Sequence, residues 1–449
     1  MADIIDTEEE DRDIINAEEL EQTFSKKYNL LSETAVSLKK TYINKLATTN
    51  GHKKALTDIV FLRKEEHLLH SCGQDGVVKL WDTRASGSCV QEYKDEEDAI
   101  VKPFECMDVS CNDRVLCAGS QTVQDDAYLV FWDQRVTKPL GGYWNTHTDD
   151  ISQVKFHKKK PNILASTALD GLLNIYNIME PAEDDALTYS LNVENSVEKL
   201  TWLSDSQVSC VTQSSDLQVW DTETGDLIRS YDRDKISRTI KRSKGDDCYV
   251  VDTYRSADGE CVVLAGSHAG NGNVLRSVTA TSKKLQPTTN FAANKQTVCC
   301  CSYNKEVIVQ VGDLHDHDTS NSFLKELREL LVTAGESGLV SVWGAGGGRG
   351  GGDGRPAPAG RRDQKAARAT QTLLSRTIHH EMPLLFHLPV GSGEPIGAQR
   401  LVLKNIGLNT SRSNARMTNN EHGDDTDIYY EVLGSRRWRY SFNPIICVM

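Results

Sequence analysis

The chain of 449 residues lacks any long hydrophobic run and is poor in aromatic residues, which make up 7% of it. Apolar runs such as Cys261–Ala265 are far shorter than the roughly 18 residues that a membrane-spanning helix requires. The lack of such runs argues against an integral membrane protein.

The start of the chain also lacks the features of a secretory signal peptide. It reads MADIIDTEEEDRD, which is acidic where a signal peptide is basic and then apolar. We therefore expect an intracellular protein, in the cytoplasm and/or the nucleus. In a reducing compartment the 12 cysteines should be mostly free thiols. The run Cys299–Cys301 has no CxxC partner elsewhere, so the cysteines give no support to a zinc site.

Positive charge is in deficit, with 51 basic against 64 acidic residues and a net charge of -13. This balance argues against a protein whose whole surface grips nucleic acid or acidic lipid. The charge is unevenly placed, because residues 1–24 hold ten acids and one base, whereas residues 344–449 hold nine acids and fourteen bases. We predict that residues 1–27 form a disordered acidic leader.

A repeat with a fixed internal spacing occupies the middle of the chain. In residues 52–84 and 147–178 a histidine precedes an aspartate by 23 residues and an aromatic residue by 29, and a serine lies four residues before the aspartate. The two sets are His52, Ser71, Asp75 and Trp81, and His147, Ser166, Asp170 and Tyr176. In a third, less complete copy Asp126 lies six residues before Trp132, and Trp220 marks a fourth copy.

The aromatic landmarks at positions 81, 132, 176 and 220 are separated by 51, 44 and 44 residues. Each interval contains short runs of Val, Ile, Leu and aromatic residues, broken by Gly, Asp, Asn and Ser, which predicts one four-stranded sheet per repeat. The pattern resembles the WD-repeat family of β-propellers, and the resemblance covers residues 44–343. It implies an all-β fold, a propeller of about six to seven blades.

We place the propeller at residues 28–343, with clear blades ending near residues 84, 135, 178 and 222 and degenerate blades over residues 246–343. Within the degenerate part the sequence FLKELRELL, ending at Leu331, has a short helical pattern. Residues 28–50 are predicted to supply the last two strands of a blade shared by the two ends of the chain. The Gly/Arg-rich, low-complexity composition of residues 344–449 predicts a disordered tail.

The resemblance implies a structural role for the repeated residues, because in WD propellers the His, Ser, Asp and Trp of one blade form a buried hydrogen-bonded set. A buried aspartate is tolerable when it is paired in this way. A His-Ser-Asp grouping also occurs in hydrolases, but this grouping recurs in more than one blade, as structural features do. We therefore predict a protein that is not an enzyme. The predicted structural residues are His52, Ser71, Asp75, Trp81, Asp126, Trp132, His147, Ser166, Asp170, Tyr176 and Trp220.

Two other patterns are consistent with cofactor or metal binding at first sight. Residues 313–318 hold five potential metal ligands, but structural metal sites usually draw their ligands from two separated pairs, so we expect an exposed loop. The glycine run at residues 344–354 formally contains GxGxxG, but it follows no βαβ pattern and precedes no helix. We predict no metal, no cofactor and no catalytic residue.

Two successive blades end in Trp-Asp-x-Arg, and in a subset of WD-repeat proteins this ending docks on the adaptor of cullin-four-type ubiquitin ligases. The resemblance thus implies partner-binding roles for Asp82, Arg84, Asp133 and Arg135. The arginine would offer its planar donor fork to an acceptor on a partner, or it would pair locally with the preceding aspartate. We predict a protein-protein interaction scaffold, most specifically a ubiquitin ligase substrate receptor.

The basic tail supports an alternative function. An Arg-Gly segment followed by a positively charged tail is able to touch RNA through charge and stacking, which would make the chain an RNA-associated protein. Against this, a single arginine sits between the glycine runs and no aromatic residue interleaves them. We expect instead that residues 344–449 are not a functional domain and reflect translation past a normal exon boundary.

Overall fold

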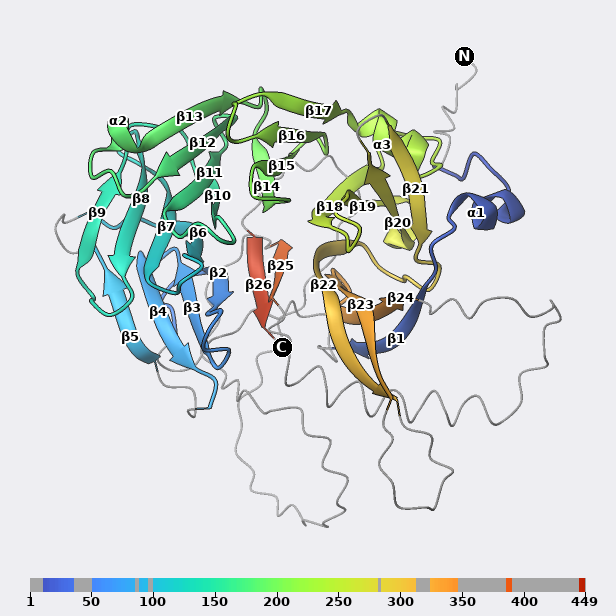
Figure 1. Cartoon of the computed structure of the whole chain (residues 1–449), viewed down its shortest axis with the longest axis horizontal. Coiled ribbons are helices and arrows are strands. Elements are labelled where there is room, and N and C mark those ends of the chain that lie inside the picture. The colour runs from blue at the N-terminus through green and yellow to red at the C-terminus, as the bar shows by residue number, and fades with distance from the viewer. Residues whose placement is uncertain are drawn as a thin grey trace, which may run out of the picture.

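The chain folds into six four-stranded antiparallel sheets that are arranged as the blades of a propeller (Figure 1). The computed structural model describes residues 11–35, 51–84, 89–95, 100–281, 284–311, 324–345, 385–389 and 444–448. In the first five sheets the strands neighbour one another in the order in which they follow along the chain. The all-β propeller fold predicted from the repeat is confirmed, and the described residues form six blades.

The first three sheets contain the clearest repeats. The first consists of β2 (Leu56–Phe61), β3 (Leu68–Gly73), β4 (Val77–Asp82) and β5 (Cys89–Lys94). The second consists of β6 (Phe104–Val109), β7 (Val115–Val123), β8 (Asp126–Asp133) and β9 (Pro139–Tyr143). The third consists of β10 (Ile151–Phe156), β11 (Ile163–Ala168), β12 (Leu172–Asn177) and β13 (Leu187–Asn192), with helix α2 (Glu183–Ala186) before its outer strand.

The other three sheets continue the series of blades. The fourth consists of β14 (Val197–Trp202), β15 (Gln207–Thr212), β16 (Leu217–Asp221) and β17 (Leu227–Tyr231), followed by helix α3 (Arg233–Thr239). The fifth consists of β18 (Cys248–Arg255), β19 (Cys261–Ser267), β20 (Val274–Ala280) and β21 (Leu285–Asn290), with the 3-10 helix η1 (Ala269–Gly272). The sixth consists of β22 (Val298–Val311), β23 (Leu324–Gly335), β24 (Leu339–Ala345) and β1 (Tyr28–Ala35).

The burial of each strand follows its distance from the centre of the ring. Strand β2 and its counterparts in the following sheets neighbour one another as the innermost strands. Second strands such as β19 are buried along their whole length, because a sheet covers each of their faces, and they read as continuous apolar runs. Outer strands such as β13 alternate between exposed and more buried residues, as a half-covered strand does.

Each predicted repeat ends on the third strand of a sheet, and the outer strand of that sheet comes after it. The third strands end at Asp82, Asp133, Asn177 and Asp221. The sequence repeat and the structural blade are therefore offset by one strand.

Aromatic residues from neighbouring blades pack against each other. The ring of Trp132 meets that of Phe104 edge to face, with centroids 5.8 Å apart, and lies 6.5 Å from the ring of Tyr93 in the first sheet. On the other side of the propeller, Phe291 packs edge to face on Trp343 of the sixth sheet at 5.1 Å. Such contacts add about 0.5 to 1.5 kcal/mol each beyond the burial of apolar area.

The sixth sheet is shared between the two sides of the chain. Strand β1 pairs with β24, so residues 28–35 supply one outer strand of a sheet whose other three strands come from residues 298–345, where two strands were predicted from residues 28–50. Residues 36–50 lie outside the described residues. The helical pattern predicted up to Leu331 is wrong, since residues 324–335 form β23. Residues 324–328 pair with β22, residues 330–334 pair with both β22 and β24, and this pairing overrides the local preference of Leu, Lys, Glu and Arg for helix.

The acidic leader is ordered over residues 11–27, which corrects the prediction that residues 1–27 are disordered. Helix α1 (Ala17–Thr23) begins after Asn16, whose side chain accepts a hydrogen bond from the amide of Glu19. Before it, the carboxylates of Asp11 and Asp13 bond to buried arginines of the propeller. An acidic composition is typical of a disordered segment, but the two aspartates of this leader are held by ion pairs.

The tail at residues 344–449 lies mostly outside the described residues, and so does the potential metal-ligand run at residues 313–318. The described part of the tail is the end of β24 and two strands, β25 (Leu385–Pro389) and β26 (Pro444–Val448), which pair with each other. Strand β26 lies against β2 and β25 lies against β22, between the first and sixth sheets (Figure 1). Among the described residues, no helix has the length and apolar character that crossing a membrane requires.

One buried histidine is expected to weaken the fold. His70 in β3 is fully buried, neither ring nitrogen has a hydrogen-bond partner, and burial lowers its pKa to about 3, so the ring is neutral. Replacement of His70 with leucine should raise the free energy of unfolding by about 1 to 2 kcal/mol, because an unsatisfied buried polar group is removed. Urea unfolding followed by tryptophan fluorescence measures this change, with the more exposed His67→Leu as control. A lower midpoint for H70L would contradict the expectation.

Candidate functional site

The histidine, serine, aspartate and tryptophan of the first repeat meet in the first sheet. Trp81 Nε1 donates to Ser71 Oγ at 2.7 Å, and Ser71 Oγ lies 2.8 Å from Nε2 of His52. The other ring nitrogen, Nδ1, lies 2.8 Å from Asp75 Oδ1. A consistent assignment has the serine hydroxyl donating to Nε2 and the protonated Nδ1 donating to the aspartate. Asp75 precedes Gly76, whose positive φ of 71° gives the tight turn its shape.

The third sheet holds a second set of the same kind. His147 lies 3.0 Å from Asp170 through Nδ1 and 2.7 Å from Ser166 Oγ through Nε2. Tyr176 occupies the place of the tryptophan, and its hydroxyl lies 2.6 Å from Oγ1 of Thr146. Tyrosine thus keeps the aromatic packing, while its polar end finds a different partner.

Both sets are electrostatically satisfied and closed to substrates. Burial raises the pKa of Asp75, but the hydrogen bonds from His52 and two backbone amides outweigh burial and hold the pKa below its usual value. The same balance lowers the pKa of Asp170. Ser71 and Ser166 are fully buried, so neither hydroxyl is accessible to a substrate. The geometry of both sets therefore favours a structural role over a catalytic one.

Three other predicted structural residues stand outside such a set. Trp132 is fully buried, but its Nε1 has no hydrogen-bond partner. Asp126 accepts a hydrogen bond from the hydroxyl of Tyr128 at 3.3 Å instead of joining a histidine. Trp220 donates to Oε1 of Gln218 at 3.0 Å.

The sixth sheet contains a tryptophan pair that the sequence analysis missed. Trp343 Nε1 donates to Thr333 Oγ1 at 2.9 Å, and both residues are buried. The signal was present in the sequence, because Thr333 precedes Trp343 by ten residues, as Ser71 precedes Trp81.

The first Trp-Asp-x-Arg ending forms a bidentate ion pair on the surface. Arg84 donates from Nε to Oδ1 of Asp82 at 3.0 Å and from Nη2 to Oδ2 at 2.7 Å. These bonds from Arg84 lower the pKa of Asp82 to about 2. The arginine side chain remains 67% exposed, so its pairing with the aspartate leaves the outer edge of the guanidinium open to a partner.

The second ending repeats this geometry one blade further on. Arg135 donates from Nε and Nη2 to the two carboxylate oxygens of Asp133, each at 2.9 Å, and Arg114 adds a third hydrogen bond at 2.8 Å. Bonds from Arg135, opposed by burial and joined by Arg114, lower the pKa of Asp133. The Arg135 side chain is 64% exposed.

The two arginines occupy equivalent places on one face of the ring. Each lies two residues beyond the end of the third strand of its sheet. The equivalent residues in the third and fourth sheets are Met179, which is 73% exposed, and Glu223. We call the face that carries Arg84 and Arg135 the arginine face.

Exposed aliphatic side chains accompany the two arginines. In the first two sheets the outer strand has a bulge opposite the third strand, and Val90 and Leu140 occupy it. Their exposed fractions are 56% and 64%, and Ile228 occupies the same bulge in the fourth sheet with 37% exposed. The arginine face therefore combines a charged and an apolar group in each of two adjacent blades.

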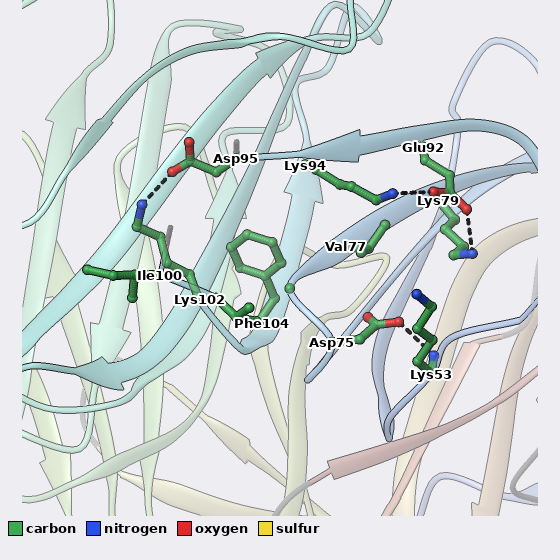
Figure 2. Close-up of a pocket in the computed structure, with 12 residues that line it drawn as sticks. Lys53, Asp75, Val77, Lys79, Glu92, Lys94, Asp95, Ile100, Lys102 and Phe104 are labelled. Carbon is green, nitrogen blue, oxygen red and sulfur yellow. Dashed lines mark hydrogen bonds and ion pairs between the residues drawn. The ribbon is translucent and has the colours of Figure 1, made fainter. Parts of the chain in front are cut away.

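A pocket of about 500 Å³ lies between the first two sheets (Figure 2). Five of its charged side chains pair with one another, since Lys79 and Lys94 both bond to Glu92, and Lys102 bonds to Asp95. These charges are satisfied within the chain. Among the described residues, no group of three or more His, Cys, Asp or Glu side chains is arranged to hold a metal ion.

Comparison with known proteins adds a family and two relatives. The family model described as WD domain, G-beta repeat matches residues 43–82. The chain is 25% identical to the WD repeat-containing protein 89 homolog of Dictyostelium discoideum over 301 residues, which cover 66% of this chain and 74% of that protein. It is 29% identical to the WD repeat-containing protein GTS1 of Arabidopsis thaliana over 49% of this chain and 56% of that protein. Among solved structures, a chain of the "Crystal Structure of Mitotic Checkpoint Complex" is 13% identical with a TM-score of 0.46, covering 65% of this chain and 76% of that chain.

Proposed function

The chain is a WD-repeat β-propeller protein, and from this premise we propose that it is a non-enzymatic scaffold that docks on the adaptor of a cullin-four-type ubiquitin ligase and presents a substrate to it. WD-repeat propellers generally serve as protein-interaction scaffolds. A scaffold of this kind shares the compartment of its ligase, the cytoplasm and/or the nucleus.

The observation that carries the proposal is the pair of arginines, Arg84 and Arg135, on consecutive blades of the arginine face. The aspartate two residues earlier fixes each guanidinium with two hydrogen bonds. Because the side chain is already held in one conformation, a partner that accepts a hydrogen bond from it pays less conformational entropy. Guanidinium forks are suited to carboxylate and carbonyl acceptors at such an interface.

Charge reversal tests the proposal on the full chain. The amount of adaptor that co-purifies from cell extract should be at least ten-fold lower with the R84E/R135E variant than with the wild type. Each glutamate repels the neighbouring aspartate, Asp82 or Asp133, and also repels the acceptor on the partner. The conservative R84K/R135K variant should lose less, since it keeps the charge and removes the fork.

The matched control is Lys284→Glu, which reverses an exposed charge in the fifth sheet. It should leave adaptor recovery unchanged, and a thermal melt of each variant checks that the fold is intact. Recovery of the adaptor by R84E/R135E at the wild-type level would overturn the proposal, as would the absence of adaptor from the wild-type preparation.

A further inference from the structure

Three cationic side chains gather where the innermost strands of alternate sheets end. Arg63 follows β2 of the first sheet, Lys158 follows β10 of the third, and Arg255 is the last residue of β18 in the fifth. Arg63 Nη1 donates to the backbone carbonyl of Lys158 at 3.4 Å, and the charge of Arg255 also acts on Lys158. We call these three residues the channel-mouth cluster.

The cluster lies on the arginine face. The first and third strands of a sheet run in the same direction, since each is antiparallel to the strand between them. The end of β2, where Arg63 lies, therefore opens on the same face as the end of β4, where Arg84 lies. The cluster is set at the centre of this face, and Arg84 and Arg135 stand further out on it.

The three charges are not neutralised by ion pairs. Within the described residues, the guanidinium of Arg63 bonds to the carbonyl of Lys158 and that of Arg255 to the carbonyl of Gly259, and no carboxylate lies within ion-pair distance of either or of Lys158. The nearby Asp113 carboxylate is already bonded to two backbone amides. Burial and the charges of Arg63 and Arg255 lower the pKa of Lys158, against the field of Asp252 deeper in the ring. Three like charges without ion-pair partners favour an anion between them, although the fields of Asp108 and Asp252, which lie beyond ion-pair distance, oppose part of this charge.

We propose that the channel-mouth cluster binds an acidic segment of a protein partner, with carboxylates received between Arg63, Lys158 and Arg255. The two guanidinium forks are able to hold carboxylates through paired hydrogen bonds, while Lys158 supplies a mobile point charge. The site is separate from the arginine pair that the proposed function uses, so this proposal can be tested independently of the ligase adaptor.

The surroundings of the cluster favour a peptide over a nucleic acid. A strand of nucleic acid needs a continuous basic track with aromatic side chains on which bases stack. Around the cluster several cations are paired, with Lys159 bound to Asp205, Lys160 facing Glu223 and Arg114 bound to Asp133. These pairs interrupt a continuous basic track, so the cluster suits a short run of carboxylates.

Fluorescence anisotropy on the full chain tests the site with a fluorescein-labelled peptide of eight glutamates. We expect saturable binding that weakens as salt is raised, and no binding of the matching eight-glutamine peptide. The R63Q/K158Q/R255Q variant should bind the glutamate peptide at least ten-fold more weakly. The matched control R84Q/R135Q/K284Q removes three exposed cationic side chains elsewhere and should bind it as the wild type does.

The single variant Lys158→Gln guards against misfolding of the triple variant, because it changes one side chain in place of three, and it should weaken binding about three-fold. Wild-type affinity in the triple variant, or an equal loss in the control, would overturn the proposal. A ten-nucleotide uridine RNA that binds more tightly than the peptide and depends on the same three residues would also overturn it. Loss of adaptor recovery in R84E/R135E with intact peptide binding would separate this site from the proposed function.

Discussion

Replacement of Asp11 with alanine is expected to lower the free energy of unfolding by about 3 to 5 kcal/mol, because it leaves a buried arginine without its main partner. The Asp11 carboxylate accepts hydrogen bonds from Arg242 Nε at 2.8 Å, Ser267 Oγ at 2.6 Å and the amide of Lys244 at 2.9 Å. Arg242 is 6% exposed. Urea unfolding at pH 7 measures the loss.

The pH dependence of this loss has a definite sign. Burial raises the pKa of Asp11, but the bonds from Ser267, Lys244 and Arg242 outweigh burial and bring the pKa below its ordinary value of 3.8. A carboxylate with a lowered pKa stabilises the fold above its unfolded-state pKa, and that stabilisation is lost as pH falls through the folded-state pKa. The deficit of D11A should therefore be constant between about pH 5 and pH 8 and shrink below about pH 4.

The control for Asp11 is an acidic residue of the same leader. Glu18 is exposed in the first turn of α1, so Glu18→Ala should cost about 0.3 to 1 kcal/mol through the helix dipole alone. D11A should also speed trypsin cleavage after Lys26 and Lys27, since the leader is released from the propeller. Equal stability losses in D11A and E18A would show that the leader is not anchored by Asp11.

The sequence predicted best those parts of the fold that are held by local contacts. His52, Ser71, Asp75 and Trp81 lie within one sheet, so their spacing recurs wherever the same hydrogen bonds are made. The fifth sheet has no such set and was predicted as degenerate, although its strands pair along their whole length. The feature that the fifth sheet shares with the others is the burial of apolar side chains. Many different sequences can bury such side chains, so this feature leaves no fixed pattern of residues.

What the sequence did not predict depends on partners that are remote along the chain. Asp11 and Arg242 are separated by 231 residues, and no local pattern in the acidic leader distinguishes an anchored aspartate from a solvated one. Strand β23 read as a helix because its own residues favour helix, whereas its neighbours β22 and β24 decide its conformation. The channel-mouth cluster was missed for the same reason, since its members come from three different sheets.

Replacement of Lys155 with methionine is the second change with a large expected effect, a loss of about 3 kcal/mol at pH 7.5. Lys155 lies on β10 in the field of carboxylates from other blades, and Asp58 and Asp108 raise its pKa in spite of burial. These two carboxylates join neighbouring sheets, since Asp58 accepts a hydrogen bond from the amide of Met107 at 3.0 Å and Asp108 from that of Phe156 at 2.7 Å. Lys155 is the charge that lowers the pKa of both carboxylates most, so without it their negative charges are less well compensated.

The loss in K155M should shrink as pH falls. Burial raises the pKa of Asp58 to about 6 even though Lys155 opposes the shift. An aspartate with a raised folded-state pKa stabilises the fold below its unfolded-state pKa, and that contribution is lost as pH rises through the folded-state value. Removal of Lys155 raises this pKa further, so at pH 5 Asp58 is protonated and the deficit of K155M should be less than half of its value at pH 7.5.

A double-mutant cycle decides whether this charge pairing is the cause. In a D58N background, K155M should cost less than it does in the wild type, because one of the carboxylates that it leaves unpaired is already neutral. Lys199→Met is the matched control in the neighbouring inner strand, where the lysine acts chiefly on Asp252, and it should cost less than K155M. If the costs of D58N and K155M are additive and the deficit of K155M is the same at pH 5 and pH 7.5, then Lys155 stabilises the ring by packing and not by holding carboxylates of separate blades together.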